Sequence, residues 1–241
     1  MKTINYCFTH KQLEYNNVAQ YSPFGLEDVS FPLQTLKEVT DSDLIYTYCP
    51  VWSHKASRTF IVRSPIEFEF SFDNNALSYA LDWPDTNKLP FHDVLMLDPG
   101  WNNTKTPVIQ VHHPTLAIWT EHKNIWYEVR PHAPTVSKNF YAVGGWFNIS
   151  NWHRTSAFGM HIVDTKNPVK VKRGDPLFEI CFYSDNLDDK YRLVKHDTIP
   201  DDEYKRMIST SNVKNYLKGF TKGLFKKQEE SKCPFAFLFN K

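Results

Sequence analysis

Four candidate metal ligands lie near the ends of predicted strands in the middle of the chain: His112, His113, Glu121 and His132. Imidazole and carboxylate groups suit iron, manganese, nickel or zinc, and open coordination positions would let such a metal bind oxygen or activate water. Because His112 and His113 are adjacent, their rings point to opposite faces of a strand, and only one can join a site without a bulge. We therefore expect these histidines to be scattered over the fold and the protein to have no cofactor. The alternative is a transition-metal site.

An aromatic segment with basic residues extends from Gly144 to His161. Its candidate ligand- or partner-binding residues are Trp146, Trp152, His153 and Arg154. Two tryptophans beside an arginine can form a stacking platform for a planar ligand, or the centre of a protein interface. The alternative is that the tryptophans belong to the core and that Arg154 pairs with an acidic side chain. This segment is the strongest single candidate site in the sequence.

A third candidate is a basic face near the C-terminal end. Lys214, Lys218 and Lys222 recur every four residues and would line one side of a predicted helix over residues 212–228. This face could contact phosphates or an acidic partner, although a solvated helix surface is the commoner explanation. The formal net charge of the chain is only +1, so nucleic acid and membranes are not expected partners.

Common catalytic and redox motifs are absent from the sequence. It contains no G-x-S-x-G, no P-loop and no G-x-G-x-x-G. Cys7, Cys49, Cys181 and Cys233 form no CxxC pair, which argues against a zinc ribbon or a dense disulfide framework. We expect these cysteines to be buried free thiols. The sequence also shows no signal peptide and no apolar run long enough to cross a bilayer, so we expect an intracellular protein.

The elements that must position these residues are mainly strands. Aromatic residues make up 15% of the chain, which favours half-buried strands, and the 15 prolines argue against long helices. Residues 66–72 alternate strictly between apolar and polar, so one face of a strand is buried. Residues 57–183 contain about eight short predicted strands separated by turns, including a hairpin of residues 116–121 and 125–130. This pattern predicts a β-sandwich or jelly roll of the double-stranded β-helix kind.

The chain divides into three predicted parts. Residues 1–48 form an N-terminal extension packed on the domain, with a strand over residues 3–8 and a short β-type run that starts at Leu44 and stops before Pro50. Residues 49–185 form the jelly-roll-like core. Residues 186–241 form a small helical appendage, which begins with a helix over residues 201–208 and ends in an apolar tail over residues 235–239.

Three stretches of the sequence resemble a known protein family. They are residues 49–66, residues 119–129 and residues 145–178, which include Cys-Pro-Val-Trp, Trp-Thr-Glu and Arg-Gly-Asp-Pro-Leu-Phe. Together, over residues 45–185, they are similar to an uncharacterised family of T4-like marine phages with no established activity. The turn at Arg173-Gly174-Asp175 also resembles the Gly-Asp turn of dUTPase-like β-clip domains, but the uracil-binding hairpin and catalytic Asp motif of that family have no counterpart here.

These observations lead to three functional hypotheses. The first is a phage-encoded, non-catalytic binding or assembly protein, found in the host cytoplasm or the virion, that associates with itself or with another phage protein. The second is a metal-dependent jelly-roll enzyme of the cupin or oxygenase type that uses the histidines and Glu121. The third is a domain that binds a small ligand or a nucleotide around Trp146, Trp152 and Arg154.

Overall fold

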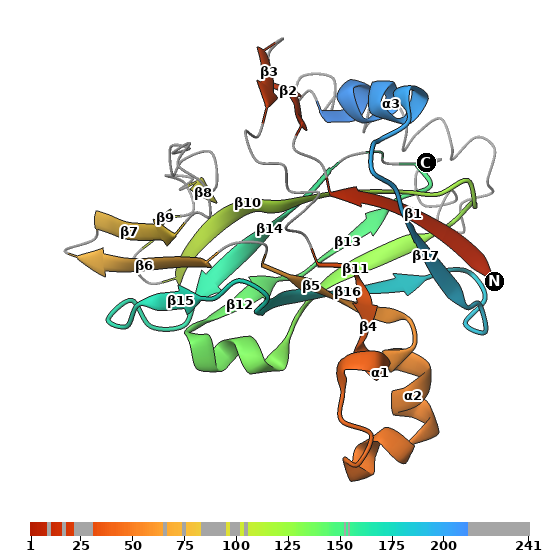
Figure 1. Cartoon of the computed structure of the whole chain (residues 1–241), viewed down its shortest axis with the longest axis horizontal. Coiled ribbons are helices and arrows are strands. Elements are labelled where there is room, and N and C mark those ends of the chain that lie inside the picture. Colours follow the sequence, from red (N-terminus) through yellow and green to blue (C-terminus); the bar gives the residue numbers. More distant parts are fainter. Residues whose placement is uncertain are drawn as a thin grey trace, which may run out of the picture.

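Most of the chain that the structure describes is β-strand. The computed structural model describes residues 1–8, 11–15, 18–21, 31–64, 67–73, 76–82, 95–96, 102–103, 106–151, 153 and 155–211. Within these residues the strands form four sheets, and the helices are short (Figure 1). The mainly β class predicted from the sequence is confirmed. None of the described helices is long and apolar enough to span a membrane.

The first sheet has the strand order β12-β14-β10-β1-β17, and β8 and β9 pair with β10 at its side. The strands are β1 (Lys2–Phe8), β8 (Leu95–Met96), β9 (Asn102–Asn103), β10 (Thr106–Trp119), β12 (Phe140–Val143), β14 (Thr155–Ile162) and β17 (Tyr191–Lys195). β1 is antiparallel to β10 and parallel to β17, so the predicted strand over residues 3–8 is confirmed. It lies inside the sheet between strands from distant parts of the sequence.

The second sheet has the order β13-β11-β16-β5-β4. Its strands are β4 (Gln34–Thr35), β5 (Thr59–Arg63), β11 (Trp126–Pro131), β13 (Gly145–Asn148) and β16 (Pro176–Tyr183). Two smaller sheets complete the strands: β15-β6-β7, with β6 (Glu67–Asp73), β7 (Ala76–Asp82) and β15 (Val169–Val171), and the pair of β2 (Lys11–Tyr15) with β3 (Val18–Tyr21).

The first two sheets share one hydrophobic core. Phe158 of β14 and Phe178 of β16 meet across it, with ring centroids 4.5 Å apart. The predicted alternation of β6 extends this core, because Phe68 and Phe70 are both buried in the same cluster. The other large side chains in this cluster come from both sheets, among them Ile4, Tyr6, Leu116, Phe140, Met160, Val62, Tyr127, Ile180 and Phe182.

The predicted hairpin of residues 116–121 and 125–130 is wrong. β10 lies in the first sheet and β11 in the second, so the chain crosses from one layer to the other between them. The crossing is held by side-chain bonds to the backbone: the Thr120 hydroxyl donates to the Thr3 carbonyl at 2.8 Å, and the Ser150 hydroxyl accepts from the Ile125 N–H at 2.8 Å. The Thr120 bond attaches the end of β10 to β1, and the Ser150 bond satisfies the Ile125 N–H at the start of the next segment.

The predicted β-type run that begins at Leu44 is also wrong, because the chain is helical there. Residues 34–57 form a lobe of short helices: α1 (Leu36–Val39), the 3-10 helix η1 (Ile45–Tyr48) and α2 (Pro50–Ala56). Local signals explain the helices. Thr35 and Glu38 form a capping box at the start of α1, and Pro50 occupies the first turn of α2, where its missing N–H costs nothing. In Figure 1 this orange lobe projects from the β4 and β5 side of the second sheet.

Two further helical segments complete the fold. The 3-10 helix η3 (Ala133–Lys138) follows β11, and α3 (Asp201–Ser211) confirms the predicted helix over residues 201–208. Met207 of α3 is buried against Cys7, Ala117 and Trp119, on the side of the first sheet that faces away from the main core. The predicted helix over 212–228, its three lysines and the apolar tail lie outside the described residues. Cys7 and Cys181 are buried free thiols as predicted, whereas Cys49 is exposed.

Candidate ligand-binding site

The outer face of the second sheet carries charged residues in register. β16 is buried along its whole middle, with Phe178, Ile180 and Phe182 in the core. Because successive side chains of a strand alternate between faces, Glu179 points to the outer side. Its neighbours across the sheet are Ile61 on β5 and Arg130 on β11. Glu179 is only 8% exposed, an unusual position for a carboxylate, and therefore needs a partner.

That partner is His132, the residue that follows β11. The His132 ring nitrogen Nδ1 lies 3.0 Å from Glu179 Oε1, and the two side chains are 13% and 10% exposed. His132 is also the cap of η3, where its carbonyl accepts from the Thr135 hydroxyl and N–H. This local turn fixes the backbone that carries the ring. With Glu179 ionised, the proton between them belongs to Nδ1, and His132 is the donor.

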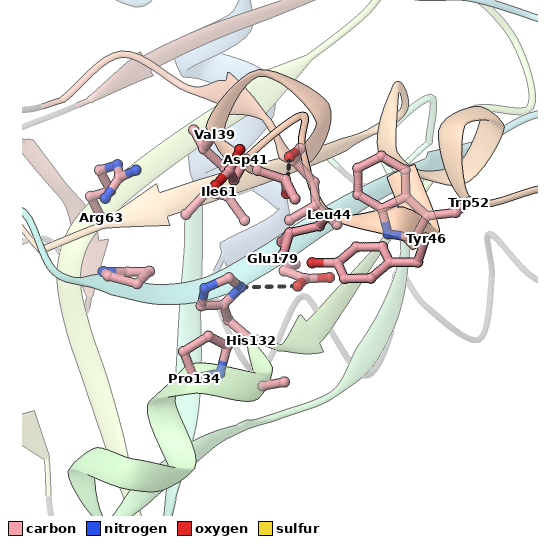
Figure 2. A pocket seen from close by; sticks show the side chains of 14 residues that line it. Val39, Asp41, Leu44, Tyr46, Trp52, Ile61, Arg63, His132, Pro134 and Glu179 are labelled. Carbon is pink, nitrogen blue, oxygen red and sulfur yellow. Dashed lines mark hydrogen bonds and ion pairs between the residues drawn. The ribbon is translucent and has the colours of Figure 1, made fainter. Parts of the chain in front are cut away.

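A cavity of about 680 Å³ lies over this pair. The second sheet supplies its floor and the lobe supplies one wall, as Figure 2 shows. Such a volume is typical of sites for small organic ligands, which are mostly apolar with a few converging polar groups. The lining residues are Leu36, Val39, Thr40, Asp41, Leu44, Tyr46, Trp52, Ile61, Arg63, His132, Ala133, Pro134, Pro176 and Glu179.

The aromatic wall of the cavity comes from the lobe. Tyr46 of η1 and Trp52 of α2 pack edge to face, with ring centroids 5.4 Å apart and planes at 66°. The Thr47 hydroxyl stabilises η1 by donating to the Leu44 carbonyl at 2.6 Å. The helices that replace the predicted strand thus bring these two rings to the cavity, where Figure 2 shows Tyr46 and Trp52 on the same side as Glu179.

Arg63 lies at the opposite side of the cavity in Figure 2. Its Nη1 donates to the Gly174 carbonyl at 2.9 Å. Gly174 has a φ of +87°, a left-handed conformation that glycine adopts without strain, and its N–H donates to the Ser64 carbonyl. The predicted turn at Arg173-Gly174-Asp175 therefore has a clear role, because it anchors the arginine at one end of the cavity.

Trp146 lies on the same outer face of the second sheet but outside the cavity lining. Its side chain is exposed and stacks on Tyr183, with ring centroids 4.6 Å apart. The Tyr183 hydroxyl donates to Glu128 Oε2 at 2.8 Å, and the Arg130 Nε lies 3.7 Å from the same oxygen. Burial, with the acidic neighbours, raises the pKa of Tyr183 above its ordinary value. Because its side chain is exposed, Trp146 remains available to a ligand or partner.

The other residues of the predicted Trp-Arg platform are placed differently. His153 bonds through Nδ1 to Oε1 of Glu203, a buried residue of α3, and Glu203 Oε2 accepts from Arg206 at 3.4 Å. His153 thus connects the start of β14 to α3. Trp152 and Arg154 lie outside the described residues.

The predicted metal ligands are spread along β10 and β11. Glu121 is exposed in the turn before β11, whereas His132 follows its far end, so about 20 Å of strand separates them. His112 and His113 belong to β10, but their side chains are not among those described. Within the described residues, no group of three His, Cys, Asp or Glu side chains could hold a metal ion.

Comparison with known proteins gives only distant structural similarity. No protein-family model and no curated protein matches the chain. Among solved structures, an EIAV dUTPase is 9% identical with a TM-score of 0.32, covering 59% of this chain and 87% of its own. The dUTPase of Staphylococcus bacteriophage 80alpha is 5% identical with a TM-score of 0.32, covering 60% and 80%.

A third dUTPase, from phage phi11 of S. aureus, is 7% identical with a TM-score of 0.31, covering 69% of this chain and 98% of its own. The chain is thus distantly similar in structure to viral and phage dUTPases. TM-scores this low assign neither a fold family nor an activity to it.

Of the cavity residues, the sequence predicted only His132 as a site residue, and it did so as a metal ligand. Glu179 was not predicted as a site residue, and Trp52 and Arg63 entered only through the family resemblance. One available signal was the single acidic residue within the apolar run Leu177–Phe182. A carboxylate flanked by apolar residues in such a strand indicates a second buried face and therefore a covering element.

Proposed function

We propose that the protein is a non-catalytic binding protein that holds a small organic molecule in the cavity between the lobe and the second sheet. The observation that carries the proposal is the cavity itself, with the buried His132–Glu179 pair at its floor and the Tyr46–Trp52 pair at its wall. Apolar side chains such as Ile61 and Leu36 supply surface to bury, and the polar pair supplies orientation.

The phage origin and the finer fold belong to the same proposal. Two of the stretches that resemble the T4-like phage family contain Trp52, Arg63 and the first part of β16, all at or beside the cavity. We propose a phage-encoded protein, acting in the host cytoplasm or the virion, whose two main sheets form a sandwich related to the jelly roll. Self-association is a second candidate function, because Trp126 and Trp146 are 40% and 55% exposed on one sheet.

A library screen by thermal unfolding tests the binding function. A ligand present at about 100 times its dissociation constant should stabilise the fold by about 2.7 kcal/mol. Trp52→Ala should abolish the shift, because it removes one ring of the cavity wall. Trp126→Ala is the matched control, since this tryptophan lies on the same sheet but does not line the cavity. The unliganded melting temperature of each variant verifies that it folds.

Two results would refute this proposal. One is a screen in which no compound stabilises the wild-type protein. The other is a set of ligands whose shifts survive Trp52→Ala but vanish with Trp126→Ala, which would move the binding site to the exposed tryptophans. A concentration-dependent solution mass that Trp146→Ala reduces would support self-association in addition.

A further inference from the structure

We infer that the ligand of this cavity is an organic ammonium ion, a primary amine whose N–H groups bind at the aromatic end. The inference rests on the proposed function and names the chemical class of the ligand. Three properties of the cavity lead to it: the hydrogen-bonding character of its unused polar atoms, the balance of its charges, and the position of its aromatic rings.

The amine inference takes His132 in its neutral form, in which the unused polar atoms of the His132–Glu179 pair are acceptors. A neutral His132 that donates from Nδ1 to Glu179 Oε1 presents a lone pair at Nε2. Glu179 keeps Oε2 as a second acceptor. Among the described residues, neither Nε2 nor Oε2 has a hydrogen-bond partner in the protein. A ligand that satisfies both atoms must therefore bring donors, and an ammonium group brings three.

The charges of the cavity favour a cation at the same end. The lining contains two carboxylates, Asp41 and Glu179, and one guanidinium, Arg63. Arg63 lies across the cavity from Tyr46 and Trp52 (Figure 2), and its Nη1 is already bonded to Gly174. With His132 in the neutral form, the Glu179 carboxylate leaves a negative charge beside Tyr46 (Figure 2). A nearly buried carboxylate such as Glu179 gains more from an opposite charge than an exposed one does, because water screens the pair less.

The aromatic pair adds a third contribution. Tyr46 and Trp52 line the cavity on the same side as Glu179. Their ring planes meet at 66°, which leaves ring surface turned toward the cavity. An ammonium ion near an aromatic face is attracted by the negative face of the ring. An anionic ligand would meet repulsion from both carboxylates and from the ring faces. A neutral amide of similar shape would still fit the cavity but would lack the charge interaction with Glu179.

Calorimetric titration of the full chain with matched ligands tests the inference. The probes are a series of primary amines from methylamine to tryptamine, the N-acetyl derivative of each, and indole-3-propionate as an anion of similar size to tryptamine. We expect at least one amine to bind, and to bind more than about tenfold tighter than its N-acetyl derivative, which is more than about 1.4 kcal/mol. Indole-3-propionate should bind more weakly than tryptamine.

Variants separate the contribution of the cavity carboxylates from a general preference for cations. Glu179→Gln should reduce the preference for the amine to less than about threefold, and Asp41→Asn, at an exposed position that does not threaten folding, should reduce it in part. Glu128→Gln is the control, because it removes a carboxylate from the same sheet face outside the cavity and should leave the preference unchanged.

The outcomes distinguish this inference from the proposed function. If neutral or anionic probes bind as tightly as the amines and Trp52→Ala abolishes their binding, the cavity binds ligands but the amine inference is overturned. An amine preference that Glu179→Gln leaves intact also overturns it. If none of the probes binds at millimolar concentration, the amine inference fails, and a blank library screen would then refute the proposed function as well.

Discussion

Replacing His132 by alanine should cost the protein about 2–3 kcal/mol of unfolding free energy, because it leaves the Glu179 carboxylate nearly buried without a partner. The Glu179 side chain is 10% exposed and that of His132 is 13% exposed, so water can only partly replace the lost bond. Glu179→Gln should cost less, about 1 kcal/mol, since the amide oxygen can still accept from His132 Nδ1 and no charge is left buried.

The double variant separates pairing from packing. If the cost of His132→Ala comes from the unpaired charge, His132→Ala combined with Glu179→Gln should cost less than the sum of the single changes, with a coupling energy of about 1 kcal/mol or more. Urea unfolding followed by circular dichroism near neutral pH measures all four proteins of the cycle. The slope of each transition verifies that the same surface is exposed on unfolding.

An exposed ion pair in the same chain provides the control. Lys170 Nζ lies 2.9 Å from Glu69 Oε1, but the two side chains are 64% and 43% exposed. Lys170→Ala should therefore cost no more than about 0.5 kcal/mol. The reasoning fails if His132→Ala costs no more than Lys170→Ala, or if the cycle is additive, because the position of Glu179 would then not depend on its partner.

Two further predictions concern the tyrosines and the turn at Gly174. Burial raises the pKa values of Tyr6, Tyr183 and Tyr191 above their ordinary value, so the unfolded chain loses these protons first as the pH rises. The stability that these tyrosines contribute should be fully present below about pH 10 and fall as the pH rises through their folded-state pKa values. Tyr183→Phe should lessen this loss of stability in melting curves at alkaline pH. An unchanged loss would show that Tyr183 is not its source. Gly174→Ala should cost about 1–3 kcal/mol in urea unfolding, because φ is +87° and the new Cβ would lie 3.2 Å from the Phe31 ring. Gly145→Ala, at an ordinary φ, should cost less, and an equal cost would show that backbone conformation is not the reason.

The strands could be predicted where local pattern alone decides them. The alternation over residues 66–72 places Phe68 and Phe70 in the core, as the structure confirms. The run before Pro50 shows the limit of this reasoning. Among the described residues no strand pairs with this run, and Tyr48 is left 75% exposed. The Thr47 hydroxyl bond to the Leu44 carbonyl and Pro50 at the start of α2 favour helical structure instead.

Apart from His132, which was predicted as a metal ligand, the candidate site could not be predicted from the sequence, for a different reason. Its residues come from the lobe, from the residue after β11 and from β16, and only sheet register brings Glu179 beside Ile61 and Arg130. Register between distant strands leaves no periodic trace in a single sequence. The binding role of Trp146 was predicted from a local signal, two tryptophans and an arginine around a Gly-Gly; its side chain is exposed, and the binding role stays a prediction.

The parallel pairing of β1 with β17 has a consequence for how the chain is made. Lys2 is in register with Tyr191, so the second edge of β1 stays open until β17, far later in the chain, has been made. Until then, half of the hydrogen-bonding groups of β1 have no strand to pair with, and an unpaired edge invites contact with other chains. Contacts so distant in sequence also slow folding, because the entropy of closing a long loop opposes them before the contacts stabilise the fold. The nascent chain therefore cannot complete the first sheet before β17 is made, and a truncation before residue 191 should accumulate as aggregate rather than as a smaller folded domain.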